Sequence, residues 1–221
     1  MRDQIVALAR EQLVEGGGEA ISLRAISRGM GLASSAIHRY FATREALVEV
    51  LRERDASALV AAIQAADRAI QPRSDYSGRI RAMLGGLRIW ALANPHSWLL
   101  LAGGASNAGA SDDGTRSEAS GDALVSQFLQ LAIRPLGEAR TAHTTIVPPR
   151  ASLSVASDVI AAVDGLTDVV PRWQLATLVA AFAWACGAVG IELQHQLDGF
   201  VQDPQALFAA GADHWIAMLG L

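Results

Sequence analysis

The side chains best suited to bind a phosphate-bearing polymer are concentrated between residues 22 and 44. Guanidinium groups form paired hydrogen bonds with phosphate and with guanine edges. Small side chains let a helix backbone approach base edges, whereas histidine, arginine and tyrosine are long enough to reach phosphates or bases. These properties favour contact with the major groove of double-stranded DNA by Ser34, Ser35, Ala36, His38, Arg39 and Tyr40, and Arg24 is a further candidate DNA-binding residue.

Apolar residues at helical spacing predict the elements that must position these side chains. A first helix is expected over residues 3–15, ended by the three glycines at 16–18. Ser22 can cap a second helix, and the glycines at 29 and 31 permit a tight reversal. A short third helix is expected over residues 34–40.

Thr43 is expected to start a fourth helix, which runs to about Ile70 before Pro72 stops it. Two short helices joined by a glycine turn and packed on a third form a helix-turn-helix, which places one helix in the major groove. The same pattern also fits a helical hairpin that binds nothing, so geometry alone leaves both interpretations open.

In this segment the chain resembles the tetracycline-repressor (TetR) family, whose DNA-binding block has the same order and spacing of residues. The matching residues are Ser22, Ile26, Gly31, Leu32, Ile37, His38, Arg39, Tyr40, Phe41 and Arg44. The resemblance implies phosphate contacts by Ser22, Tyr40 and Arg44. It implies base contacts by Ser34, Ser35 and Ala36.

The chain departs from the family pattern at two positions of this block. Ala33 stands where serine is usual at the start of the third helix, and His38 stands where tyrosine is usual. Because alanine has no side-chain acceptor, Ser34 is a candidate cap. Further along, Trp184, Gly187 and Glu192 resemble a Trp-His-Gly type of C-terminal domain found in part of the family, with Cys186 where histidine is more common.

The remainder of the chain is expected to be helical, with no strand pattern. Helices are expected over residues 76–94, 95–101, 122–140, 172–197 and 203–219, with one more around 155–163. Residues 103–121 are small and polar and are expected to form a mobile loop. The predicted fold class is all-α, with an N-terminal three-helix helix-turn-helix domain at residues 1–46 and a larger helical ligand-binding and dimerisation domain at residues 47–221.

A cavity for a small hydrophobic effector is expected among large apolar side chains on facing helices. The candidates to line it are Met83, Leu87, Trp90, Trp98, Phe128, Phe182 and Trp184. Aromatic residues at helical spacing are also ordinary core residues, so both interpretations stay open.

Residues 172–197 are apolar on nearly every side, which exceeds what burial within one domain requires. With residues 203–219 they are expected to form half of an intersubunit four-helix bundle, as in the resembled family. A twofold dimer would present two reading helices to a palindromic operator at a spacing of roughly 34 Å or a little more. The chain is thus expected to be a homodimeric repressor that its effector releases from DNA.

Two other classes of protein fit parts of the sequence, a dimeric small-molecule-binding protein and a helical enzyme without sequence-specific DNA binding. No nucleophile beside a base, phosphate-binding glycine loop or metal cluster is visible, so no catalysis, metal or cofactor is expected. Glu192 and His195 have the spacing of a di-iron ligand pair but lack the further carboxylates that such a site needs. Cys186 lies in an apolar helix and is expected to be an inert buried thiol.

The net charge of −4 would argue against nucleic-acid binding only if it were evenly spread. Residues 1–54 hold eight arginines against seven acidic residues, and every basic side chain in the protein is arginine. No apolar run is expected to reach the roughly 18 to 20 uncharged residues that cross a bilayer, and no signal peptide is evident. A single cysteine excludes an intramolecular disulfide, which fits a reducing compartment. Together these features predict a cytoplasmic protein that has no membrane partner.

Overall fold

The computed structural model describes residues 1–107, 119–142 and 170–221, which form helices and turns without any strand. The predicted all-α fold class is confirmed. The chain divides into two compact units, unit 1 (Met1–Ala58 and Asn94–Gly121) and unit 2 (Leu59–Ala93 and Asp122–Leu221). Helix α4 (Arg44–Ala69) contributes its first part to unit 1 and its second part to unit 2. The domain boundary expected after residue 46 stays a prediction.

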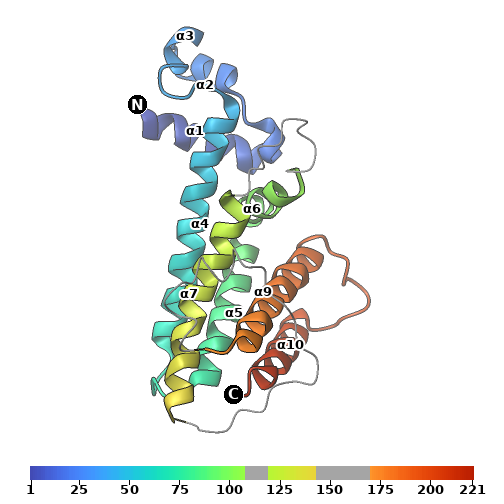
Figure 1. Ribbon diagram of the computed structural model, residues 1–221. Helices are drawn as coiled ribbons and strands as arrows, with labels where there is room; N and C mark the ends of the chain where they lie inside the picture. Colours follow the sequence, from blue (N-terminus) through green and yellow to red (C-terminus); the bar gives the residue numbers. More distant parts are fainter. Residues whose placement is uncertain (108–118, 143–169) are drawn as a thin grey trace. The chain divides into compact units, whose positions relative to one another are not determined.

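Unit 1 contains α1 (Arg2–Gly16), the 3-10 turn η1 (Gly18–Ala20), α2 (Leu23–Gly29), α3 (Ser34–Ile37), the first part of α4, and α6 (Pro95–Asn107) (Figure 1). We call Met1–Ala58 the head. Ser22 caps α2, because its hydroxyl oxygen accepts a hydrogen bond from the Ala25 amide at 3.3 Å. Thr43 caps α4 in the same way, through the Ala46 amide at 3.1 Å. Both predicted helix starts are confirmed.

One apolar core holds the elements of unit 1 together. Its side chains are at most 8% exposed, and they are Ile5, Val6, Ala9, Leu13, Ile21, Leu23, Ile26, Ile37, Phe41, Leu47, Val48, Leu51 and Leu100. Burial of each large apolar side chain contributes about 1.5 to 3 kcal/mol. Isolated helices as short as α2 and α3 are not stable in water, so this core supplies the stability that they lack.

Unit 2 contains the second part of α4, α5 (Tyr76–Ala93), most of α7 (Ala119–Ala142), α9 (Arg172–Leu193) and α10 (Pro204–Met218). Helices α5, α9 and α10 pack against one another (Figure 1). Phe128 of α7 and Phe182 of α9 pack ring against ring, with centroids 4.9 Å apart. The start of α10 is capped by Asp203, which accepts a hydrogen bond from the Ala206 amide at 2.9 Å.

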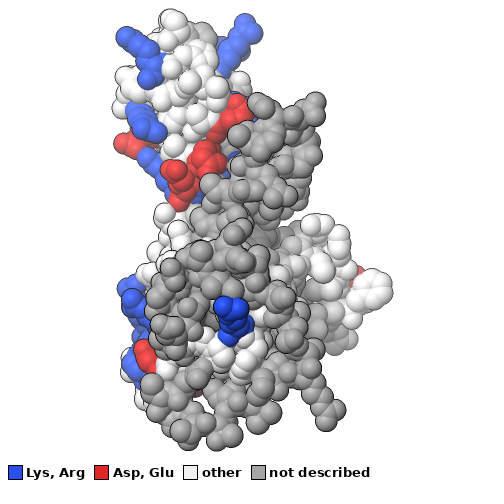
Figure 2. Space-filling model, viewed as in Figure 1, with Lys and Arg blue, Asp and Glu red and all other residues white. Residues whose placement is uncertain are grey.

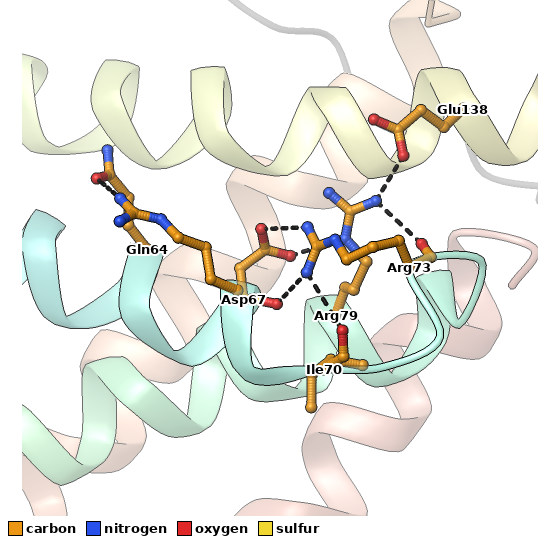
Figure 3. A network of polar contacts seen from close by, with 7 residues as sticks. Gln64, Asp67, Ile70, Arg73, Arg79 and Glu138 are labelled. Atoms are coloured by element: carbon orange, nitrogen blue, oxygen red, sulfur yellow. Dashed lines mark hydrogen bonds and ion pairs between the residues drawn. The ribbon is translucent and has the colours of Figure 1, made fainter.

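An ion network joins α4, α5 and α7 within unit 2 (Figure 3). The Asp67 carboxylate accepts hydrogen bonds from Arg79 at 2.8 Å and from Arg73 at 2.7 Å. Arg79, which is 4% exposed, also donates to Glu138 at 2.6 Å. Burial alone would raise the pKa of Asp67, but the hydrogen bonds from Arg79 and Arg73 hold it below its ordinary value. The network therefore keeps a buried guanidinium compensated, which an apolar neighbourhood requires.

Several expected helix ends are wrong. Helix α6 continues to Asn107 and α7 begins at Ala119, so helix occupies both ends of the loop expected at residues 103–121. The two glycines near the end of α6 do not stop the helix, because each glycine weakens a helix by only about 1 kcal/mol, which tertiary packing can offset. Helix α3 ends at Ile37, because the chain turns there to bury Phe41, and α9 ends at Leu193. Residues 108–118, and the helix expected around 155–163, lie outside the described residues.

The expectation that no segment is apolar enough to cross a membrane is also wrong. Helix α9 has 22 residues and reaches a mean hydropathy of 1.7 over an 18-residue window. By length and composition alone, it could span a bilayer. Half of that window is buried in the folded chain, and the core helices of globular proteins pass the same test.

Candidate nucleic-acid interface

The turn between α2 and α3 sets the direction of α3. Gly31 has a φ of 65°, in the left-handed region that glycine adopts without steric cost. The Leu32 amide donates to the Ser27 carbonyl at 2.8 Å, and the Gly31 amide donates to the Arg28 carbonyl at 3.1 Å. These backbone hydrogen bonds close the end of α2, and the chain then reverses and starts α3 at Ser34.

Two buried side chains fix α3 and the turn after it to the core. Ile37 is 0% exposed and Phe41 is 2% exposed. Of the residues around them that the sequence predicts to contact DNA, Ser35, His38, Arg39 and Tyr40 are exposed and Ala36 is half-buried, while the side chain of Ser34 lies outside what the structure describes. Arg24 is exposed on the adjoining α2. The structure thus places these predicted residues on the solvent side of one short segment and its neighbour. We call α3 with residues 38–40 the reading surface.

The two departures from the family pattern have local consequences. Ala33 precedes α3 without any side-chain cap. Nδ1 of His38 lies 3.0 Å from the Ala42 carbonyl oxygen. A carbonyl only accepts hydrogen bonds, so Nδ1 carries the proton and Nε2 stays available to another partner. His38 therefore offers a ring nitrogen to solvent where the family pattern has a tyrosine hydroxyl.

Arg44 has a structural role that the sequence did not indicate. Its Nε donates to the Ile21 carbonyl at 3.0 Å, and its Nη2 donates to the Gly18 carbonyl at 2.6 Å. These bonds tie the start of α4 to the chain before α2. Local spacing carries no signal for them, because the partners lie 23 and 26 residues earlier. The phosphate contact expected of Arg44 stays a prediction, as does that of Ser22, which is half-buried and caps α2.

The eight arginines of the head fall into two groups. The arginines of one group are bonded within the head. Three form ion pairs: Arg10 with Asp55 at 2.7 Å, Arg52 with Glu49 at 3.4 Å, and Arg54 with Asp3 at 2.5 Å. The fourth, Arg44, donates to the two backbone carbonyls described above. The other four make no hydrogen bond or ion pair with any described residue, and we call them the unpaired arginines: Arg2, Arg24, Arg28 and Arg39. On the face drawn in Figure 2, the charged side chains around α2 and α3 are arginines, and the acidic ones lie closer to α1. The reading surface therefore lies beside uncompensated positive charge.

The residues predicted to line a ligand cavity are distributed over both units. Trp98 is 3% exposed in α6 of unit 1. The other six lie in unit 2, where Met83, Leu87 and Phe128 are at most 1% exposed, Phe182 is 8% exposed, and Trp90 and Trp184 are half-buried. The structure brings Phe128 and Phe182 into ring contact. Their predicted role in ligand binding stays a prediction.

Unit 2 also has a pocket of about 450 Å³ between α9 and α10 that the sequence did not indicate. Of the predicted ligand residues only Trp184 lines it, together with residues such as Ile191, Leu207 and Phe208. The rings of Trp184 and Phe208 are 4.9 Å apart. A Cβ atom at Gly211 would lie only 2.0 Å from the Trp184 ring, so glycine is required for this close helix contact. Gly211 and Trp184 could indicate this close helix contact only to a reader who already knew that the two helices pair.

The other side chains considered for chemistry have ordinary partners. Both oxygens of Glu192 accept hydrogen bonds from Arg88, at 2.8 and 2.5 Å, and His195 lies 3.3 Å from Asp198. Burial raises the pKa of the Cys186 thiol to about 12, so the thiol stays protonated at neutral pH. Among the described residues, no group of three or more histidine, cysteine, aspartate or glutamate side chains could hold a metal ion.

Two family models match the chain. The one described as bacterial regulatory proteins, tetR family, matches residues 5–51, which include α1, α2, α3 and the start of α4. The one described as tetracyclin repressor-like, C-terminal domain, matches residues 80–215, more than half of the chain.

Curated relatives agree with the first of these matches, and a solved structure has a similar fold. HTH-type transcriptional regulator Rv1816 of Mycobacterium tuberculosis and HTH-type transcriptional regulator Mb1846 of Mycobacterium bovis are each 37% identical to the chain over 100 residues. The match covers 45% of this chain and 42% of each relative, so the chain spans about two fifths of their length. A protein with unknown function from Rhodococcus sp. RHA1 is 22% identical, with a TM-score of 0.68 over 98% of this chain and 93% of that chain. That likeness shows a shared fold.

The conformation of the turn can be tested with two glycines that lie two positions apart. Gly31→Ala is expected to lower the free energy of unfolding by about 1 kcal/mol, because φ is positive there and alanine is strained. Gly29→Ala is the matched control, since Gly29 ends α2 at an ordinary φ; it is expected to raise stability by up to about 1 kcal/mol. Neither added Cβ meets an atom within 4 Å, so only the backbone differs. Urea unfolding of both variants measures this, and equal effects would contradict the turn geometry.

Proposed function

The chain belongs to the TetR family of bacterial regulatory proteins, and on that premise we propose that it is a transcriptional regulator whose reading surface binds double-stranded DNA. The observation that carries the proposal is the pairing of buried anchors with exposed polar side chains. Ile37 and Phe41 are buried, while Ser35, His38, Arg39 and Tyr40 reach solvent within the same short segment. A short helix presented in this way can enter the major groove.

The unpaired arginines support the same function. A guanidinium already bonded to a carboxylate must lose that partner before it can bind phosphate, whereas an unpaired one loses only water and counterions. Arg24 and Arg28 lie on α2, Arg39 follows the end of α3, and all three are exposed. The net charge of −4 for the whole chain therefore does not oppose DNA binding by the head.

The regulator is proposed to act in the cytoplasm as a repressor that a small hydrophobic molecule releases from a palindromic operator. The apolar pocket of about 450 Å³ in unit 2, which Trp184 lines, supports an effector of this kind, and the roles of Met83, Leu87, Phe128 and Phe182 in binding it stay a prediction. Such a molecule releases DNA only if it binds more tightly to the conformation that does not bind the operator. No catalytic step is part of this proposal.

The second copy that a palindrome requires is proposed to bind through α9 and α10. Helices α9 and α10 enclose a pocket, and they also carry exposed apolar side chains. Ile191 on α9 is 42% exposed, Leu207 on α10 is 48% exposed, and Phe200 in the loop that joins the two helices is 88% exposed. Exposed apolar groups that cluster in this way are typical of an interface between subunits.

Salt dependence of DNA binding tests the proposed function directly. The whole chain is expected to bind a fluorescein-labelled duplex of mixed sequence with an affinity that falls steeply between about 50 and 200 mM salt, because bound arginines release counterions. The double variant Arg24→Gln/Arg39→Gln is expected to reduce the log–log slope by about 2, since each phosphate contact contributes roughly 0.9. Arg81→Gln, which removes a charge paired with Asp213 in unit 2, is the control and leaves the slope unchanged. Absence of salt-dependent binding by the unaltered protein would exclude the proposed function.

Sedimentation equilibrium tests the second copy. At micromolar concentration the protein is expected to be a dimer, and Ile191→Glu/Leu207→Glu is expected to be a monomer, because both changes place charge on the exposed apolar pair of helices. Ile89→Glu is the matched control, since Ile89 is 68% exposed on α5 and lies outside the pair. A monomeric unaltered protein, or an equally dimeric double variant, would contradict the proposed interface.

A further inference from the structure

The first helix brings an arginine to the edge of the reading surface from a distant part of the sequence. The guanidinium carbon of Arg2 lies 5.1 Å from the centroid of the Phe41 ring. Phe41 is a core residue that directly follows Tyr40, the last residue of the reading surface. The attraction of a cation for the face of an aromatic ring holds the guanidinium at that position.

The hydrogen-bonding capacity of Arg2 is left unused in the head. Among the described residues it forms no hydrogen bond and no ion pair, and its side chain is exposed. Its sequence neighbour Asp3 is bonded instead to Arg54, at 2.5 Å. The pKa of Asp3 lies below its ordinary value, first because of the hydrogen bond from Arg54 and then because of that residue's charge, with only a minor contribution from Arg2. The acid next to Arg2 in the sequence is therefore compensated by another arginine.

A guanidinium held over a ring is well placed to bind an oxyanion. Its five N–H donors form no hydrogen bond among the described residues, so they stay available to a ligand. The attraction to the ring also limits the rotamers of a long side chain before any ligand arrives, which lowers the entropy lost on binding. The family gives no reason to select Arg2, because the residues that resemble its DNA-binding block begin at Ser22 and the matching family model begins at residue 5.

We propose that Arg2, held against Phe41, is a DNA-binding residue that grips a backbone phosphate flanking the groove entered by α3. This proposal rests on the proposed function and extends the DNA contact surface from the helix-turn-helix to the start of α1. The ligand chemistry is a phosphodiester, so the contact adds affinity at any base sequence and carries no sequence preference of its own.

The test compares variants of the whole chain in salt titrations with the fluorescein-labelled duplex of mixed sequence. Arg2→Gln is expected to weaken binding several-fold at low salt and to reduce the log–log slope by about 0.9, the value for one lost phosphate contact. Arg2→Lys is expected to retain the slope but only part of the affinity, because lysine keeps the charge and lacks the planar paired donors. The control Arg68→Gln removes a charge in unit 2 that is bonded to Gln64, and is expected to change neither quantity. Thermal unfolding of Arg2→Gln close to that of the unaltered protein shows that an exposed substitution has left the head folded.

Each outcome bears on one proposal or the other. If the unaltered protein binds with a steep slope while Arg2→Gln keeps that slope, the Arg2 contact is wrong and the proposed function stands. If Arg68→Gln lowers the slope as much as Arg2→Gln does, only long-range charge is at work and the contact is again wrong. If the unaltered protein shows no salt-dependent binding, the proposed function itself fails.

Discussion

A helix as short as α3 has no stability of its own, so everything the head presents to DNA depends on the burial of Ile37 and Phe41. These two side chains belong to one core with residues of α1, α2 and α4, and that core fixes the direction in which the intervening residues point. Positive φ at Gly31 lets the chain reverse before α3. Ile37 and Phe41 are apolar and are buried in the core, while the polar residues around them stay exposed, so one short segment both folds onto the head and presents polar side chains to solvent.

The arginines of the head are likewise divided between a structural group and an exposed group. Arginines that are bonded to acids or carbonyls, such as Arg10 and Arg44, tie helices together, whereas the unpaired arginines remain on the surface. Unit 2 uses its buried charge structurally, since Arg79 is compensated by Asp67 and Glu138 (Figure 3). Net charge therefore says little about binding, and the partition between bonded and unpaired groups says more.

Features of this fold can be predicted from the sequence where the determining signal is local. Ser22 and Thr43 mark helix starts because a cap needs only a side-chain acceptor three residues before an amide. Features that depend on a tertiary partner cannot be predicted in this way: the bonds of Arg44 to Gly18 and Ile21, the position of Arg2 over the Phe41 ring, and the pocket between α9 and α10 all join residues far apart in the chain. The extension of α6 to Asn107 was missed for a related reason, because glycine and serine lower helix propensity by amounts that packing overrides.

In the proposed function, a pair of these heads reads a DNA sequence. Repeated selection of bound duplexes from a random library by the whole protein, followed by sequencing, measures whether it does so. We expect enrichment of an inverted repeat whose half-site centres lie one helical turn, roughly 34 Å, or a little more apart. A library that stays random while still binding at low salt would contradict it, because the reading surface would then contribute charge without recognition.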